Sequence, residues 1–272
     1  MAIKMIGLDL DGTLLTSDKR LTAYTKQVLM RALDKGIVVL AATGRPKSGI
    51  PEIFMNLPGI RYAITTNGAR IYDGETVIIE DPVPVEDTKK ILEIFQKYDT
   101  LREVYVSGKP YVSAKEYETI ESYVMNDAMA FYMRKSKTPS QDLMGELFRA
   151  GTGSDKVHAL FKNETERQKA FRDLENISTI DVSSALFNNI EVNKKDVNKG
   201  RALIRLGEKL GIRREEIMAA GDGLNDISML KAAGFSVAPS NGMPEALAAA
   251  DKTVLSNDED GIAKAIEKYA FL

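Results

Sequence analysis

Hydrophobic residues in the first third of the chain fall into short runs separated by an amphipathic segment. Mainly apolar runs at 3–8, 37–42 and 62–66 have the length of buried strands in a parallel sheet. Between the first two runs, Thr22 can cap a helix that ends at Gly36. The pattern therefore predicts strand, helix and strand in succession.

The last third of the chain returns to the same alternation. We expect strands at 217–220 and 235–238, and helices at 198–210, 226–233, 244–250 and 260–269. Repeated strand–helix units joined by short turns predict an α/β fold, with a parallel sheet that helices cover on both faces.

The middle third has a different pattern and predicts a separate unit. Two prolines stiffen the segment 81–84 and mark a boundary. Beyond it we expect helices at 85–97, 117–125 and 164–174, and strands near 104–106, 111–113, 156–161, 180–183 and 189–192. We therefore predict a core domain made of residues 1–82 and 193–272, and an inserted α+β domain at 83–192. Hinges near 81–84 and 193–196 would allow open and closed forms.

Composition excludes several kinds of site. The 272 residues include no cysteine, which rules out disulfides, thiolate nucleophiles and cysteine-bound zinc. The single histidine, His158, lies in a predicted strand, where we expect a structural role. The net charge of -2 gives no reason to expect nucleic acid or a membrane as partner. The chain shows no signal peptide and no run of roughly 18 apolar residues, so we expect a cytoplasmic protein. We expect it to be a monomer or a small homo-oligomer.

Four polar segments follow predicted strands of the core. They are DLDGTL at 9–14, TGR at 43–45, NG at 67–68 and GDGLND at 221–226. Each segment alone is also a common kind of turn. Ligands of open parallel sheets, however, bind at the carboxyl ends of strands. The shared position therefore indicates one site built from all four segments.

Acidic residues of these segments would meet in one crevice. Asp9, Asp11, Asp222 and Asp226 would repel one another there, and a hard divalent cation would relieve the conflict. Oxygen ligands without histidine or cysteine favour Mg²⁺ over zinc. Lys199 lies in the first turn of a predicted helix, against the helix dipole, which indicates that an anion is held nearby. Such a cation beside a metal suits the charge of a phosphoryl group.

The motifs and their order resemble those of the haloacid dehalogenase superfamily of phosphotransferases. The likeness rests on the four segments together with Lys199, and it spans nearly the whole chain. TNGA at 66–69, VNKG at 197–200 and the large insert resemble the Cof-type subfamily of sugar-phosphate phosphatases. This resemblance implies a Rossmann-like core with an α+β cap that closes over the substrate. It also implies a magnesium-dependent hydrolase of phosphate monoesters.

The resemblance further implies a role for each motif residue. Asp9 would be the nucleophile, and Asp11 would protonate the leaving alkoxide and then activate water. Asp9, the backbone carbonyl of Asp11 and Asp222 would hold Mg²⁺, and Asp226 would support them. The phosphate would be held by Thr43, Lys199, Asn225 and the backbone amides of Leu10 and Gly44. Apart from the resemblance, Arg45 at the mouth of the core and Asn67 are further candidates for binding the substrate.

Two alternatives to a phosphatase stay open. A phosphosugar mutase would share the aspartate nucleophile but would have to exclude water from the aspartyl-phosphate. A non-catalytic phosphosugar sensor is disfavoured because Asp9 and Asp11 are both present. We expect a small phosphorylated metabolite as substrate, with phosphosugars first. Polar residues of the insert such as Tyr105, Lys109 and Tyr111 are candidates for contacts with the leaving group, and many other polar residues of the insert are equally good candidates.

Overall fold

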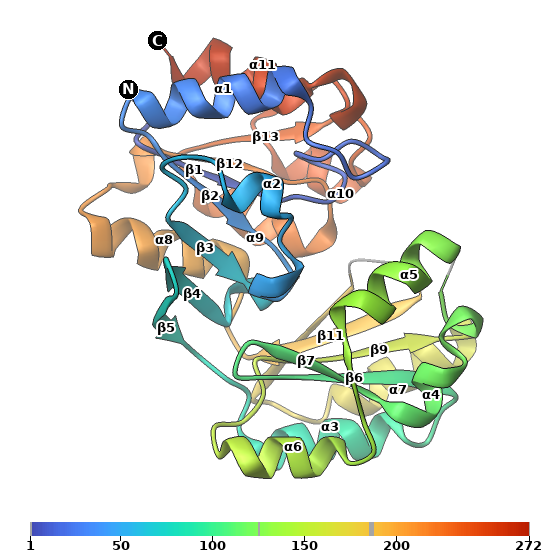
Figure 1. The fold of residues 1–272 in the computed structure, drawn as a ribbon. Helices are drawn as coiled ribbons and strands as arrows, with labels where there is room; N and C mark the ends of the chain where they lie inside the picture. Colours follow the sequence, from blue (N-terminus) through green and yellow to red (C-terminus); the bar gives the residue numbers. More distant parts are fainter. Residues whose placement is uncertain (1, 125, 185–187, 272) are drawn as a thin grey trace. The chain divides into compact units, whose positions relative to one another are not determined.

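The computed structural model describes residues 2–124, 126–184 and 188–271. Its contacts divide the chain into two compact units. The core unit consists of Met1–Ile79 and Asn198–Leu272, and the insert unit is Glu80–Val197 (Figure 1). Within the part of the chain that is described, no helix is long and apolar enough to cross a membrane.

The core unit is built on an eight-stranded sheet of described residues in the order β14-β13-β12-β1-β2-β3-β4-β5. The strands from β14 to β3 pair in parallel, and β4 runs antiparallel to β3. The strand bounds are β1 Met5–Leu8, β2 Val38–Ala42, β3 Tyr62–Thr65, β4 Arg70–Asp73, β5 Thr76–Glu80, β12 Ile217–Ala220, β13 Phe235–Pro239 and β14 Lys252–Val254. The predicted α/β fold with a parallel-sheet core is confirmed.

Helices cover both faces of this sheet because successive strand residues point to opposite sides. Ile6 and Leu8 pack with α1 (Ala23–Asp34) and α11 (Gly261–Ala270) on one face. Met5 packs with α8 (Lys199–Leu210) and α9 (Ile227–Ala232) on the other (Figure 1). Both clusters are fully apolar, as expected for a sheet buried on two sides. Two shorter helices complete the unit, α2 (Glu52–Met55) and α10 (Pro244–Ala249).

The insert unit has its own sheet, which is mostly antiparallel, with the order β10-β11-β9-β6-β7-β8. Its strands are β6 Thr100–Val106, β7 Lys109–Ser113, β8 Thr138–Ser140, β9 Lys156–Phe161, β10 Ile180–Ser183 and β11 Asn189–Lys194. One face packs against α3 (Val85–Phe95), α6 (Leu143–Ala150) and α7 (Glu164–Leu174). The other face packs against a smaller cluster from the 3-10 turn η3 (Ile120–Ser122) and α5 (Asp127–Ser136).

The two units begin and end at slightly different residues from the predicted domains. Asp81 forms an ion pair with Lys194, and Val83 bridges to Ser154, so the segment after β5 belongs with the insert. β11 likewise continues to Lys194 because it pairs with β10 and β9. The predicted division into a catalytic core and a cap, with hinges between them, stays a prediction.

Several elements were not predicted. The helix expected at 117–125 is instead a short α4 (Ala114–Glu118) followed by η3, and Met125 lies outside the described residues. The strands β4, β5, β8 and β14 and the helices α5 and α6 were missed. Asp73-Gly74, where β4 ends and the turn to β5 begins, is a dipeptide typical of turns that could have revealed that pair of strands.

Candidate active site

The four predicted motif segments follow β1, β2, β3 and β12, which are neighbours in the core sheet. Because these strands run parallel, their carboxyl ends lie at the same edge. Asp9 follows β1, Thr43 follows β2, Thr66 follows β3 and Gly221 follows β12. The fold therefore brings together segments more than 200 residues apart, such as Thr13 and Asp222, whose sequence separation is 209.

Three carboxylates meet at this edge of the sheet. Asp9, Asp222 and Asp226 each present an oxygen, and these oxygens lie within 4.8 Å of one another. Burial raises the pKa of Asp9 well above its ordinary value, and the carboxylates of Asp226, Asp222 and Asp11 add to the rise against the opposing charge of Lys199. Burial likewise raises the pKa of Asp222 to about 6, with a further contribution from Asp226. The positive charge of Lys199 therefore does not offset burial and the mutual repulsion of the carboxylates.

The chemistry of this donor set fits a hard divalent cation. All three donors are carboxylate oxygens, which Mg²⁺ and Ca²⁺ prefer, and their mutual repulsion falls when a cation lies among them. Asp226, predicted in a supporting role, belongs to the same cluster as Asp9 and Asp222. Its carboxylate also accepts hydrogen bonds from the backbone N–H groups of Asp222 (3.0 Å) and Gly223 (2.9 Å), which fixes the loop that carries Asp222.

Lys199 is a fully buried cation between two of these carboxylates. Its Nζ lies 2.6 Å from Oδ1 of Asp9 and 2.6 Å from Oδ1 of Asp226. Burial alone would lower the pKa of Lys199, but the two carboxylates outweigh it and raise the pKa above its usual value. Lys199 is the first residue of α8, whose cap is Asn198. The ammonium therefore has partners that offset the unfavourable helix dipole.

Gly12 makes the close approach of the first and last motifs possible. Its φ of +80° is a conformation that side chains disfavour, and a Cβ there would lie 2.4 Å from Oδ2 of Asp222. The neighbouring Thr13 hydroxyl donates to Oδ1 of Asp222 over 2.5 Å. A glycine is thus required here both by the turn and by the packing of the metal-ligand candidate.

The turns after β2 and β3 interlock beside the acidic cluster. Asn67 N–H donates to the carbonyl of Thr43 (3.1 Å), and the Asn225 amide donates to Oδ1 of Asn67 (3.2 Å). A Cβ on Gly44 would lie 2.9 Å from the same Asn67 oxygen. Thr66 and Asn67 have left-handed φ values of +49° and +59°. Asparagine tolerates this region, but the β-branched Thr66 is strained there. Such strain at the edge of a binding site is a common feature of functional turns.

Leu10 enters the site only through its backbone. Its side chain is fully buried in the core cluster between the sheet and helices α1 and α11. The Leu10 carbonyl accepts from the backbone N–H of Leu15 (2.8 Å), which closes the turn after β1. The predicted contact of its amide with phosphate stays a prediction.

Asp11 has different partners from the other carboxylates of the site. Arg45 donates to both of its oxygens, and Lys19 forms an ion pair with Oδ1. Burial raises the pKa of Asp11, but Arg45 and Lys19 outweigh burial and hold the pKa below its ordinary value. Arg45 was predicted as a substrate-binding residue and here binds a catalytic candidate. Lys19 was not predicted, since a lysine in a loop carries no distinguishing signal.

The insert residues named from the sequence lie in different surroundings. Tyr105 is buried and donates to Glu103 (2.8 Å), while Lys109 is exposed and Tyr111 packs partly against the core of the insert. His158 is also buried, with Nδ1 3.4 Å from Oε1 of Glu103. These contacts belong to the insert's own sheet.

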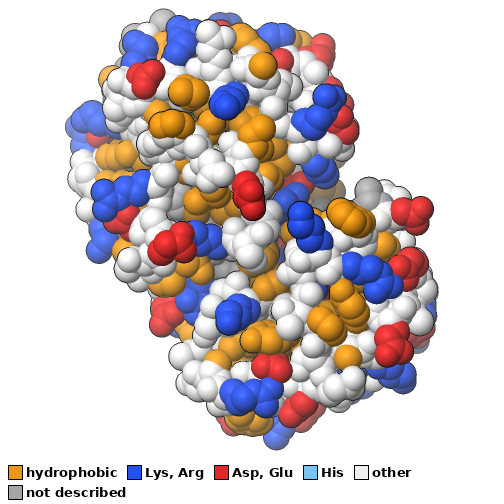
Figure 2. Space-filling view, in the orientation of Figure 1, with side chains coloured by type: hydrophobic (Ala, Val, Ile, Leu, Met, Phe, Trp, Pro, Cys, Tyr) orange, Lys and Arg blue, Asp and Glu red, His pale blue; other side chains and the backbone are white. Residues whose placement is uncertain are grey.

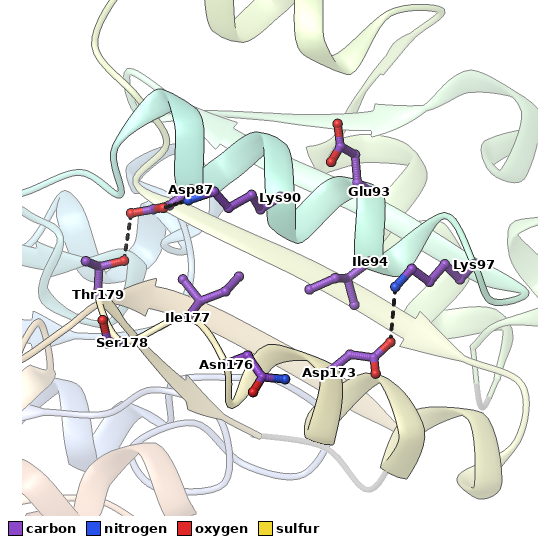
Figure 3. A pocket seen from close by; sticks show the side chains of 10 residues that line it. All are labelled: Asp87, Lys90, Glu93, Ile94, Lys97, Asp173, Asn176, Ile177, Ser178 and Thr179. Atoms are coloured by element: carbon purple, nitrogen blue, oxygen red, sulfur yellow. Dashed lines mark hydrogen bonds and ion pairs between the residues drawn. The ribbon is translucent and has the colours of Figure 1, made fainter.

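A surface pocket of about 550 Å³ lies in the insert between α3 and the chain after α7 (Figure 3). Two lysines of the lining pair with aspartates of the lining, Lys97 with Asp173 (3.4 Å) and Lys90 with Asp87 (3.0 Å). The Thr179 hydroxyl donates to Asp87 over 2.6 Å. The lining residues are Asp87, Lys90, Glu93, Ile94, Lys97, Asp173, Asn176, Ile177, Ser178 and Thr179. None of the motif residues is among them, so the pocket is distinct from the strand-end cluster.

Comparison with known proteins agrees with the geometry of the strand-end cluster. The family of haloacid dehalogenase-like hydrolases matches residues 6–266. The chain belongs to this family. Its relatives are phosphatases, and the protein is a phosphatase acting on phosphate monoesters. The predicted superfamily and enzyme class are thereby confirmed.

Individual relatives align with this phosphatase over almost its whole length. The 5-amino-6-(5-phospho-D-ribitylamino)uracil phosphatase YcsE of Bacillus subtilis is 29% identical over 98% of this chain and 96% of its own. The pyridoxal phosphate phosphatase YbhA of Escherichia coli is 29% identical over 99% of both chains.

Solved structures share the fold over the same length. A haloacid dehalogenase-like hydrolase from B. subtilis superimposes with a TM-score of 0.85 at 28% identity, covering 98% of this chain and 99% of the other. The subclass IIB sugar phosphatase BT4131 gives a TM-score of 0.81 at 25% identity, covering 99% of this chain and 100% of the other.

Proposed function

We propose that this phosphatase is magnesium-dependent and acts through an aspartyl-phosphate on Asp9. The observation that carries the proposal is the Asp9 carboxylate itself. It is buried at the end of β1, held by the Lys199 ammonium at 2.6 Å and clustered with Asp222 and Asp226. A carboxylate fixed in this way is oriented as a nucleophile, and Lys199 supplies positive charge for phosphate oxygens.

The proposed chemistry has two transfers. In the first, an oxygen of Asp9 bonds to phosphorus as the ester bond breaks, and the leaving alkoxide takes a proton from Asp11. In the second, Asp11 takes a proton from water as the water oxygen bonds to phosphorus and the Asp9–phosphorus bond breaks. Free phosphate leaves, and both aspartates return to their initial state.

The carboxylates of Asp9 and Asp222, with the backbone carbonyl of Asp11, would hold Mg²⁺. When bound, Mg²⁺ would supply charge stabilisation for the transferring phosphoryl group. Thr43, Asn225 and the backbone amides at residues 10 and 44 would orient the phosphate oxygens, and Asn67 would hold the amide of Asn225 in place. Asp226 would keep the Asp222 loop and Lys199 in position.

For the substrate we propose a small phosphorylated metabolite, with phosphosugars as the first class to test. Support comes from the sugar phosphatase among the structural relatives. Two other relatives act on a phosphoribitylamino pyrimidine and on pyridoxal phosphate, so these compounds belong in the same panel. We also propose that the insert unit acts as a cap that contacts the leaving group, and that the protein works in the cytoplasm.

The test is an assay of free phosphate released from that panel and from 4-nitrophenyl phosphate. We expect release with Mg²⁺, and loss of release with EDTA or in Asp9→Asn. Release that survives Asp9→Asn would contradict the proposed nucleophile. The variant Asp73→Asn, at the last residue of β4 and outside the acidic cluster, serves as a matched control for an aspartate-to-asparagine change.

The same assay separates the two alternatives. A phosphomutase would convert a phosphosugar to its isomer with little free phosphate, and isomer formation is visible by ³¹P nuclear magnetic resonance. A sensor would bind phosphosugars with no turnover of any ester. Free phosphate in proportion to substrate consumed would exclude both.

A further inference from the structure

Both oxygens of the Asp11 carboxylate are held by cations from other parts of the core unit. Arg45 Nε donates to Oδ2 over 2.6 Å, and Arg45 Nη2 donates to Oδ1 over 2.6 Å. Lys19 Nζ lies 2.8 Å from Oδ1. The two Arg45 bonds form a planar fork, which fixes the plane of a carboxylate as well as its position.

Arg45 is itself anchored by contacts that do not involve Asp11. Its Nη1 donates to the carbonyl of Gly49 (2.6 Å), and its backbone N–H donates to the hydroxyl of Thr43 (3.1 Å). The backbone carbonyl of Arg45 accepts from Thr66 N–H (3.0 Å). The Arg45 side chain is only 16% exposed. The guanidinium is therefore a fixed point against which Asp11 can be oriented.

Lys19 is a different kind of contact. It reaches Asp11 from the loop between β1 and α1, where its φ is +63°, and its side chain is 56% exposed. A lysine ammonium, unlike a guanidinium, does not fix the plane of a carboxylate, and it can rotate into solvent. Lys19 therefore holds the Asp11 carboxylate less firmly than the Arg45 fork does.

We propose that Arg45 is a positioning residue for Asp11, orienting its carboxyl group for proton transfer to the leaving group. The inference rests on the proposed function. Asp11 directly precedes the turn at Gly12, and its side chain is 36% exposed. Among the described residues, Arg45 and Lys19 bind that side chain. Without the fork, the carboxyl group would sample orientations that cannot reach the ester oxygen.

Leaving-group chemistry tests this role. An alkyl phosphate such as glycerol 1-phosphate needs a proton on its leaving oxygen, whereas the anion of 4-nitrophenol leaves without one. We would measure the single-turnover release of each alcohol, which reports the first transfer alone, and the KM of each ester. The variants are Arg45→Gln and Arg45→Lys, with Asp11→Asn as the reference for a lost acid.

We expect Arg45→Gln to slow the alkyl ester about 10- to 100-fold more than the aryl ester, in the same direction as Asp11→Asn. Arg45→Lys should fall between the wild type and Arg45→Gln because it keeps the charge and loses the fork. Equal losses with both esters, or a higher KM with unchanged release rates, would overturn the inference. The second result would instead make Arg45 a substrate-binding residue.

A double-mutant cycle in EDTA tests the contact without relying on turnover. We expect the melting-temperature changes of Arg45→Gln and Asp11→Asn not to add in the double variant, because the two residues share one interaction. Arg20→Gln is the control, since its side chain pairs with Asp18 and should add to Asp11→Asn. If the melting-temperature changes of Arg45→Gln and Asp11→Asn add in the double variant, the inference is overturned even when the enzyme is active. A wild type that hydrolyses no ester would contradict the proposed function, and the cycle would still decide the contact.

Discussion

At the scale of single residues, the site depends on a glycine as much as on its carboxylates. Gly12 combines a φ of +80° with a would-be Cβ that falls 2.4 Å from Asp222 Oδ2. Gly36 has nearly the same φ, +78°, with no atom within 4 Å of a would-be Cβ. Comparing alanine variants of Gly12 and Gly36 therefore distinguishes the effect of backbone strain from the effect of displacing Asp222.

We expect Gly12→Ala to lower the rate of phosphate release by roughly tenfold or more, because Asp222 must move. Gly36→Ala should leave that rate unchanged. Both variants should lose about 1 kcal/mol of stability from the unfavourable φ, with a further loss for Gly12→Ala. Rates are measured by phosphate release and stability by urea unfolding. Equal rates in the two variants would show that the contact with Asp222 has no catalytic importance.

Residue identities predicted which side chains would gather, but not how they pair. Asp9, Asp222 and Lys199 could be grouped from the sequence because each follows a strand or begins a helix at the same edge. The fork from Arg45 to Asp11 could not, since side-chain direction after a turn depends on φ and on neighbours. Lys19 itself has a left-handed backbone conformation, and nothing in the sequence around it predicts this.

At the scale of elements, β6 and β9 of the insert carry a buried charged network. Glu103 on β6 accepts from Lys137 (2.6 Å) and Tyr105 (2.8 Å), and His158 on β9 lies beside it. Burial alone would raise the pKa of Glu103, but Lys137 and His158 outweigh it and lower the pKa well below its usual value. The ionised carboxylate is thus stabilised in the folded insert.

The pH dependence of this network has a definite sign. Glu103 has a folded pKa below its unfolded value of 4.5, so its contribution to stability is present above about pH 4.5 and is lost as the pH falls below it. We expect Glu103→Gln to lose about 3 kcal/mol of stability at pH 7, because Lys137 is left buried without its anion. The difference from wild type should shrink below pH 4.5.

Denaturant unfolding at pH 7, 5 and 4 measures that difference. Glu166→Gln is the control, because Glu166 is partly exposed and lies on α7. A gap that stays constant or grows as the pH falls would show that Glu103 does not stay ionised in the folded insert.

Elements with strong periodicity were predictable, and those formed by context were not. The core strands β1, β2 and β12 are short runs buried on both faces, and α8 has a clear apolar stripe ending at Gly211. In contrast, α5 presents the exposed Phe131 beside the buried Met133, which blurs its pattern. The strand β8 has only three residues and contains Pro139, so only its pairing with β7 defines it.

At the scale of the whole molecule, the acidic cluster links stability to pH and, under the proposed function, would link it to a bound metal. Asp222 has a folded pKa of about 6 and Asp9 one well above 3.8, so both bind protons more tightly when folded. The contribution of Asp222 to stability is complete below about pH 3.8 and is lost as the pH rises through about 6. The contribution of Asp9 changes in the same direction. A bound cation offsets that loss by stabilising the ionised carboxylates.

We therefore expect Mg²⁺ to raise the melting temperature more at pH 7.5 than at pH 5, relative to EDTA at equal ionic strength. Asp222→Asn should reduce the Mg²⁺ effect, and Asp251→Asn, which removes a carboxylate outside the cluster, should keep it. Differential scanning calorimetry provides the measurement. A Mg²⁺ effect that is the same at both pH values, or that survives Asp222→Asn unchanged, would place the cation elsewhere.

The central claim is that phosphate passes through a covalent bond to Asp9, and trapping that bond tests it most directly. The enzyme is mixed with 4-nitrophenyl phosphate and Mg²⁺, quenched in acid within milliseconds and digested at low pH for peptide mass spectrometry. We predict one added phosphoryl group on the peptide that contains Asp9, sensitive to hydroxylamine and missing from Asp9→Asn. Phosphate release by the wild type with no such peptide, or a phosphoryl group on another residue, would contradict the account.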